Sequence, residues 1–149
     1  MQPLHNDIFF AEVENLIAEG KDVVLKVKGH SMRPFMRSDR TRVRLSPCDR
    51  LSLRKGDTVL FRYGGRHVMH RIICRRGDAL TLAGDGNRGM TEHCTLQDVV
   101  ARVTAVITKR GKVIGCNTAL WRTASAAWLA LPAFMRRMIL GAMWRAGIK

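Results

Sequence analysis

Ser31 lies in the segment G-H-S-M-R-P at positions 29–34, where a serine is preceded by glycine and followed by proline. Residues 22–28 alternate apolar and polar side chains, which predicts a strand with one buried face just before this segment. A turn at the end of a strand holds a hydroxyl away from the strand's hydrogen bonds, where another molecule can reach it. Because a serine hydroxyl is a weak nucleophile at neutral pH, Ser31 needs a base to remove its proton.

His70 has a side chain of the right type to act as such a base. Imidazole ordinarily titrates at about pH 6.5, so an imidazole can accept a proton near neutral pH. On an alternating strand, His70 shares one face with Val68, Ile72 and Cys74. A histidine on such a face can equally be a core residue with satisfied hydrogen bonds, so its position alone leaves both interpretations open.

The elements that must position these residues are mostly short strands. Apolar residues at helix-like spacing predict a helix over 7–19, with Asp7 capping its start and Gly20 ending it. Alternating or short apolar runs bounded by turn signals predict strands at 22–28, 41–45, 58–63, 66–74, 79–83, 99–108 and 113–116. Residues 118–149 change character and predict one or two helices.

Four segments, taken together, resemble the signal peptidase I and LexA-like serine peptidases. The segment around Ser31 is similar to their nucleophile box, whose pattern is close to G-x-S-M-x-P. Further along, L-R-K-G-D-T-V-L-F at 53–61 and V-M-H-R-I-I at 68–73 resemble a strand opened by Gly-Asp and the strand of the general base. The segment L-A-G-D-G-N at 82–87 resembles the Gly-Asp-x-Asn segment of the endoplasmic-reticulum and archaeal branch, which uses histidine as base, as at position 70 here.

This resemblance covers roughly residues 23–106 and implies a mainly β protein with the complex β fold of that superfamily, an N-terminal helix and C-terminal amphipathic helices. It implies a serine endopeptidase in which Ser31 is the nucleophile and His70 the general base. A third group should orient the imidazole, as an aspartate does in serine triads. We expect Asp85 in this role, although a loop aspartate between two glycines can simply cap its own turn. Glu92 is the alternative, because the branch often has another aspartate near that place.

The same resemblance assigns Gly29, Met32 and Pro34 to substrate binding or to the oxyanion site. The backbone N–H of Ser31 can supply one oxyanion donor. Many signal peptidases add a serine hydroxyl two positions before the nucleophile, and Gly29 in that place makes the segment more like the LexA type. We expect the substrate to be a precursor protein or peptide, bound as an added strand beside the strand that leads to Ser31, with small residues before the cut.

Composition predicts one ordinary globular domain: the chain has 149 residues, of which 46% are hydrophobic. We divide it into a single peptidase-like β domain with its N-terminal helix, 1–117, and a basic, Trp-rich helical extension, 118–149. The four cysteines form no C-x-x-C pair and are expected to be reduced core thiols. We expect no metal and no cofactor, because the histidines and cysteines match no zinc-ligand spacing.

The strongly basic charge suggests an anionic partner. Lys and Arg number 26 against 12 Asp and Glu, which gives a formal net charge of +14. Such a charge attracts phosphate, anionic lipid or acidic peptide. The basic runs contain few aromatic residues on which bases could stack, so we interpret them as solvated strand faces and do not expect nucleic-acid binding.

The segment 118–149 is apolar, basic and rich in tryptophan, so it can lie at an anionic membrane surface, dock on a partner or close the domain's own core. The sequence has no apolar window of about 18 residues and no secretory signal pattern at its N-terminus, so we expect a cytoplasmic protein, with contact at a membrane surface left open. The alternative function is a non-catalytic regulator or binding module of the same fold that uses its basic surface for nucleic acid or anionic membrane.

Overall fold

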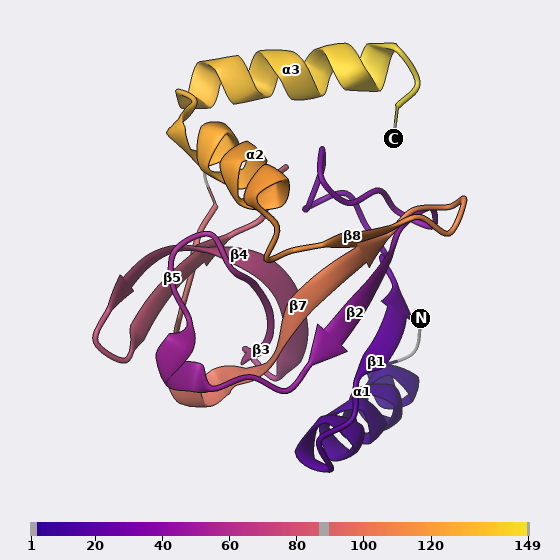
Figure 1. Ribbon diagram of the computed structural model, residues 1–149, viewed down its shortest axis with the longest axis vertical. Helices are drawn as coiled ribbons and strands as arrows, with labels where there is room; N and C mark the ends of the chain where they lie inside the picture. The colour runs from indigo at the N-terminus through magenta and orange to yellow at the C-terminus, as the bar shows by residue number, and fades with distance from the viewer. Residues whose placement is uncertain (1–2, 87–89, 149) are drawn as a thin grey trace.

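The computed structural model describes residues 3–86 and 90–148, with only the backbone described for residues 3–7. Over these residues, eight strands form one antiparallel sheet of order β1-β2-β7-β3-β4-β5-β6, with β8 paired to β7. The sheet is strongly curved, and the helices lie outside it (Figure 1). The strands are β1 (Val23–Lys26), β2 (Arg42–Ser46), β3 (Thr58–Tyr63), β4 (Arg66–Arg76), β5 (Ala79–Ala83), β6 (Glu92–Thr95), β7 (Val99–Ile107) and β8 (Val113–Gly115).

Three α-helices flank the sheet in the described part of the chain, together with two short 3-10 helices. They are α1 (Pro3–Ala18), α2 (Ala119–Ala130), α3 (Ala133–Arg145), η1 (Arg50–Ser52) and η2 (Leu96–Asp98). This arrangement confirms the expected class, a mainly β protein with an N-terminal helix and C-terminal helices. No helix in residues 3–86 and 90–148 is both long enough and apolar enough to cross a membrane.

Alternation along the strands sorts side chains into two apolar clusters. In β2, Val43 and Leu45 are buried while Arg42 is exposed, as the sequence predicts. The first cluster combines α1, β1, β2, β7 and Trp121 of α2. The second lies among β3, β4, β5 and η2 and includes the fully buried Phe61. Each fully buried large apolar side chain contributes roughly 1.5–3 kcal/mol, so these clusters are the main force that stabilises the curved sheet.

Apart from shifts of one or two residues at strand ends, the structure differs from the predicted elements at the start of α1 and at β6. Helix α1 begins at Pro3, so Asp7 lies inside the helix and does not cap it. Gly20 ends the helix as expected, with a φ of 83° and a hydrogen bond from the next N–H to the Leu16 carbonyl, five residues back. Strand β6 was not predicted, because its four residues are mainly polar. Pro132 separates α2 from α3, since proline lacks the N–H that a continuous helix requires.

The two C-terminal helices differ in how much of their surface is buried against the rest of the protein. Helix α2 lies between the sheet and α3 (Figure 1). It buries Trp121 and Trp128, and its first turn is capped by the Thr118 side chain, which accepts a hydrogen bond from the Trp121 N–H. Helix α3 buries only Leu140 among its described residues. The division at 117/118 falls between β8 and α2 and stays a prediction.

Candidate active site

Ser31 lies in the loop that joins β1 to β2, which we call the Ser31 loop. Just before the serine, Gly29 has a φ of 83°, a conformation that favours glycine, and its N–H donates to the Ser38 hydroxyl at 3.0 Å. Just after it, Met32 and Met36 are buried in the first apolar cluster. The loop is therefore anchored on both sides of Ser31, which remains half-buried.

A second segment, 84–86, packs directly against the Ser31 loop. The Gly86 N–H donates to the Ser31 carbonyl at 2.7 Å. A Cβ added at Gly86 would lie 2.7 Å from the His30 carbonyl oxygen, so a side chain does not fit without displacing backbone. Close backbone contact is thus a physical reason for glycine at this position of the L-A-G-D-G-N segment. Asn87, the last residue of that segment, lies outside the described residues.

His70 is buried on β4 and is held by Glu92 of β6. The Nδ1 atom of His70 lies 3.0 Å from Oε2 of Glu92, and both side chains are less than 15% exposed. An ionised carboxylate only accepts hydrogen bonds, so Nδ1 carries the proton in this contact. In a neutral imidazole with this tautomer, the other ring nitrogen, Nε2, has a free electron pair.

Ser31 and His70 line one pocket of about 210 Å³. The pocket lies between the start of the Ser31 loop and β4, and its remaining walls come from Val27, Lys28, Gly29, Met32, His67, Val68 and Met69. Of the three residues assigned to substrate or oxyanion binding, Gly29 and Met32 belong to this lining and Pro34 lies outside it. The structure therefore brings the predicted nucleophile and the predicted base to the same cavity.

Asp85 has a different partner from the one expected. Its carboxylate receives three hydrogen bonds from the Arg71 guanidinium: Nε to Oδ1 at 2.8 Å, Nε to Oδ2 at 3.1 Å and Nη2 to Oδ2 at 2.7 Å. Burial raises the pKa of the Asp85 carboxyl, and the hydrogen bonds and charge of Arg71 oppose that rise. The expected contact between Asp85 and His70 is replaced by this buried ion pair, and the alternative residue, Glu92, makes the contact with the imidazole.

The alternation of side chains along β4 explains why Glu92 and Asp85 have different partners. His70 and Arg71 are consecutive on β4, so their side chains leave the sheet on opposite faces. Arg71 is fully buried, its Nη1 donates to the Gly56 carbonyl at 2.9 Å, and its Cζ lies 4.8 Å from the centre of the Phe35 ring. Sequence reasoning missed this arginine, because its only local signal was a charged residue inside an apolar strand.

Tryptophans of the C-terminal helices contact both segments of the site. The Trp128 indole N–H of α2 donates to the Asp85 carbonyl at 3.1 Å. The Trp144 ring of α3 lies 5.8 Å from the His30 ring and 5.2 Å from the Arg33 guanidinium carbon, measured to ring centres. The helical extension thus packs on the residues that flank Ser31, a contact that sequence analysis did not predict.

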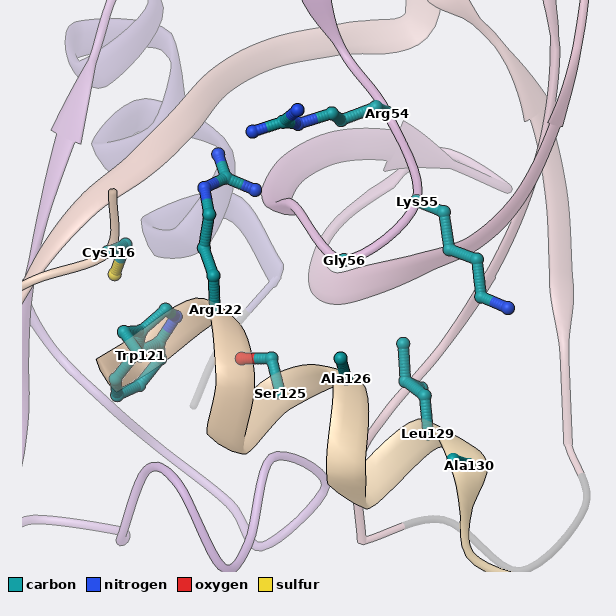
Figure 2. A pocket seen from close by; sticks show the side chains of 10 residues that line it. All are labelled: Arg54, Lys55, Gly56, Cys116, Trp121, Arg122, Ser125, Ala126, Leu129 and Ala130. Atoms are coloured by element: carbon teal, nitrogen blue, oxygen red, sulfur yellow. The ribbon is translucent and has the colours of Figure 1, made fainter. Parts of the chain in front are cut away.

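A separate basic pocket of about 490 Å³ lies between α2 and the turn that precedes β3 (Figure 2). Figure 2 shows Trp121, Arg122 and Leu129 projecting from α2, and Arg54 above the pocket. Arg122 is paired with Asp57, Nη2 to Oδ1 at 3.3 Å. Neither Ser31 nor His70 lines this pocket, so its size does not make it the reaction site.

Comparison with known proteins adds no assignment. No protein-family model matches the chain, and no curated protein matches it. Within the described residues, no group of three or more histidine, cysteine, aspartate or glutamate side chains is arranged to hold a metal ion. The site is therefore interpreted from its own geometry and from the resemblance of its segments.

Proposed function

We propose that this chain is a serine endopeptidase that hydrolyses a peptide bond in a precursor protein or peptide. The observation that carries the proposal is the shared pocket of Ser31 and His70, together with the contact between Glu92 and Nδ1 of the His70 imidazole. A hydroxyl, an imidazole and a carboxylate are the groups that serine hydrolases use on unrelated folds. The resemblance of four segments to signal peptidase I and LexA-like peptidases supports the same reaction.

The proposed reaction has two stages. In the first, His70 Nε2 takes the proton of Ser31 Oγ while Oγ attacks the scissile carbonyl carbon. The same nitrogen then gives the proton to the leaving amine, the C–N bond breaks and an acyl ester remains on Ser31. In the second stage, Nε2 takes a proton from a water molecule whose oxygen attacks the ester carbon. Nε2 then gives this proton to Ser31 Oγ as the ester C–O bond breaks, which releases the acid product and restores the serine hydroxyl.

Glu92 is the proposed orienting carboxylate. By accepting the Nδ1 proton, it fixes the tautomer that leaves Nε2 free, and its negative charge stabilises the imidazolium that forms during proton transfer. The contact is largely shielded from water. Electrostatic interactions are stronger in the protein interior than in water, so the effect of Glu92 on the imidazole is enhanced. Asp85 is a positioning residue in this proposal, since it ties the 84–86 segment to Arg71 next to the Ser31 loop.

The sheet offers a place for an extended substrate. Strand β1 is the first strand in the order of the sheet and pairs with β2 among the described strands. An edge strand presents unpaired backbone groups to which a peptide can add as a further strand. A peptide added along β1 would run toward Ser31, whose backbone N–H is the proposed oxyanion donor.

Cleavage of a peptide library by purified protein tests the proposal. Ser31→Ala and His70→Ala should each lower the rate at least roughly 100-fold, because each removes a group that acts in proton transfer or bond formation. Ser52→Ala and His93→Ala are matched controls on exposed residues outside the pocket and should retain activity.

Equal cleavage by all five proteins would assign the activity to a contaminant and contradict the proposal. Absence of cleavage by the wild type, together with nucleic-acid binding that falls steeply with salt, would favour the alternative of a non-catalytic binding module.

A further inference from the structure

Helix α3 presents an apolar face that the rest of the molecule leaves uncovered. Phe134 and Met138 are four residues apart, hence on one side of the helix, and are 63% and 68% exposed. Met135 and Ile139 extend this face and are also exposed. We call these four residues the α3 apolar face. Soluble proteins seldom expose large contiguous apolar patches unless the patch contacts a partner or a membrane.

The opposite side of α3 already has its partners. Leu140 is buried, and Arg136 and Met143, on the same side, are half-buried. Near the end of the helix, Trp144 packs on His30 and Arg33 of the Ser31 loop. The helix lies on the outer side of α2, away from the sheet (Figure 1). The α3 apolar face is therefore directed away from the body, while the other side of the helix is fastened to it.

The charge around the α3 apolar face is uniformly positive. Arg137 and Arg145 on the same helix are exposed. After Asp98, the sequence contains nine Lys and Arg residues and no Asp or Glu. A purely apolar protein groove would leave these charges without complementary groups. A bilayer surface that contains anionic lipid supplies both an apolar boundary for Phe and Met and a negative headgroup layer that long arginine side chains can reach.

We propose that α3 binds the interface of anionic lipid membranes, with the α3 apolar face at the acyl boundary and Arg137 and Arg145 among the headgroups. Because Trp144 fastens α3 to the Ser31 loop, a chain bound in this way holds the Ser31 pocket close to the membrane surface. The binding itself does not require the proposed peptidase activity, so it can be tested separately from the chemistry.

Sedimentation of the full chain with vesicles tests the proposal. The wild type should bind vesicles of phosphatidylcholine with phosphatidylglycerol, bind vesicles of phosphatidylcholine alone much more weakly, and be released by salt. Met138→Glu should lower the partition coefficient at least roughly 10-fold, because a charge replaces a side chain at the acyl boundary. The double variant Arg137→Gln with Arg145→Gln should lower it roughly 30-fold, since each basic residue near an anionic surface contributes about a factor of five.

Matched control variants distinguish binding through the α3 apolar face from nonspecific binding through other exposed apolar or basic residues. Leu51 of η1 is 72% exposed and lies outside α3, and Arg76 is an exposed arginine at the end of β4. Leu51→Glu and Arg76→Gln should lower binding by less than about 3-fold, and circular dichroism should show the same helix content in all variants. Equal binding to both vesicle types, equal loss in the control variants, or no binding by the wild type would each overturn the proposal. In the last case, self-association measured by sedimentation velocity would point to a second copy on this face.

Discussion

Glu92 Oε2 lies 3.0 Å from His70 Nδ1, whereas the carboxylate of Asp85 lies against the guanidinium of Arg71. Since His70 and Arg71 are neighbours on β4, each carboxylate serves one face of the strand. The His70–Glu92 contact of the proposed active site and the buried Arg71–Asp85 ion pair therefore lie on opposite faces of β4. Substitution of the two carboxylates should therefore have different consequences.

Glu92→Gln should impair catalysis while leaving the fold intact. The amide lacks the negative charge that stabilises the imidazolium and can present either its oxygen or its nitrogen to Nδ1. We expect kcat/KM for a cleaved peptide to fall by roughly 100- to 10,000-fold. Glu19→Gln is the matched control, because Glu19 forms an exposed ion pair with Lys21 outside the pocket. An unchanged kcat/KM in Glu92→Gln would contradict the assigned role.

Asp85→Asn should instead destabilise the protein. The substitution leaves the Arg71 guanidinium buried without its counter-charge, and loss of one partner of a buried ion pair typically costs about 3–5 kcal/mol. Urea denaturation followed by circular dichroism would measure the loss. Glu19→Gln, which removes an exposed ion pair with Lys21, should leave the midpoint nearly unchanged. A similar midpoint for Asp85→Asn and the wild type would show that the pair does not hold the segment.

Gly86→Ala should disturb the Ser31 loop through backbone contact. The added Cβ would meet the His30 carbonyl at 2.7 Å, and overpacking of this kind costs about 1–3 kcal/mol. Peptidase activity should fall with it, because Gly86 also donates a hydrogen bond to the Ser31 carbonyl and so helps to position Ser31. Gly141→Ala in α3 is the control: nothing lies within 4 Å of its Cβ, and alanine favours helix by up to about 1 kcal/mol. Denaturation midpoints of the two variants should therefore move in opposite directions.

Cys94 and Cys116 should be slow to react in the folded protein. Burial raises the pKa of Cys116 to about 12 and that of Cys94 to about 11. Because the thiolate is the reactive form, a raised pKa leaves these groups neutral at pH 8, with roughly a thousandth or less as thiolate. A thiol-specific disulfide reagent at pH 8 should modify both slowly in the folded protein and rapidly in denaturant. Reaction of either at the rate of a free cysteine in the folded state would contradict this expectation.

The parts of the fold that the sequence predicted are those with local signals. Strands β3 and β5 have the predicted bounds, because apolar runs bounded by turns specify them without help from distant residues. Strand β6 gave no such signal, since its residues are Glu, His, Cys and Thr. It forms by pairing with β5, a partner that the sequence around it does not indicate. Helix α1 starts earlier than predicted. The prediction relied on Asp7, a good capping residue by type, which lies inside the helix.

The candidate site divides in the same way. The Ser31 segment and His70 were singled out by residue type together with the family resemblance of their segments, and they line one pocket. The partner of His70 could not be chosen, because Glu92 is on the strand that the sequence failed to reveal. The turn around Asp85 likewise carried no information about Arg71, which reaches it from another strand. Contacts between distant segments, such as Trp144 with His30, had no local signature.

Covalent labelling of the folded chain with a serine-directed fluorophosphonate tests the central claim most directly, because phosphonylation requires an activated hydroxyl but no knowledge of the substrate. We expect mass spectrometry to place the label on Ser31 in the wild type. His70→Ala should slow labelling at least roughly 100-fold, while His93→Ala should label like the wild type. No label on Ser31, or equal labelling in the presence and absence of His70, would contradict a serine nucleophile activated by that histidine.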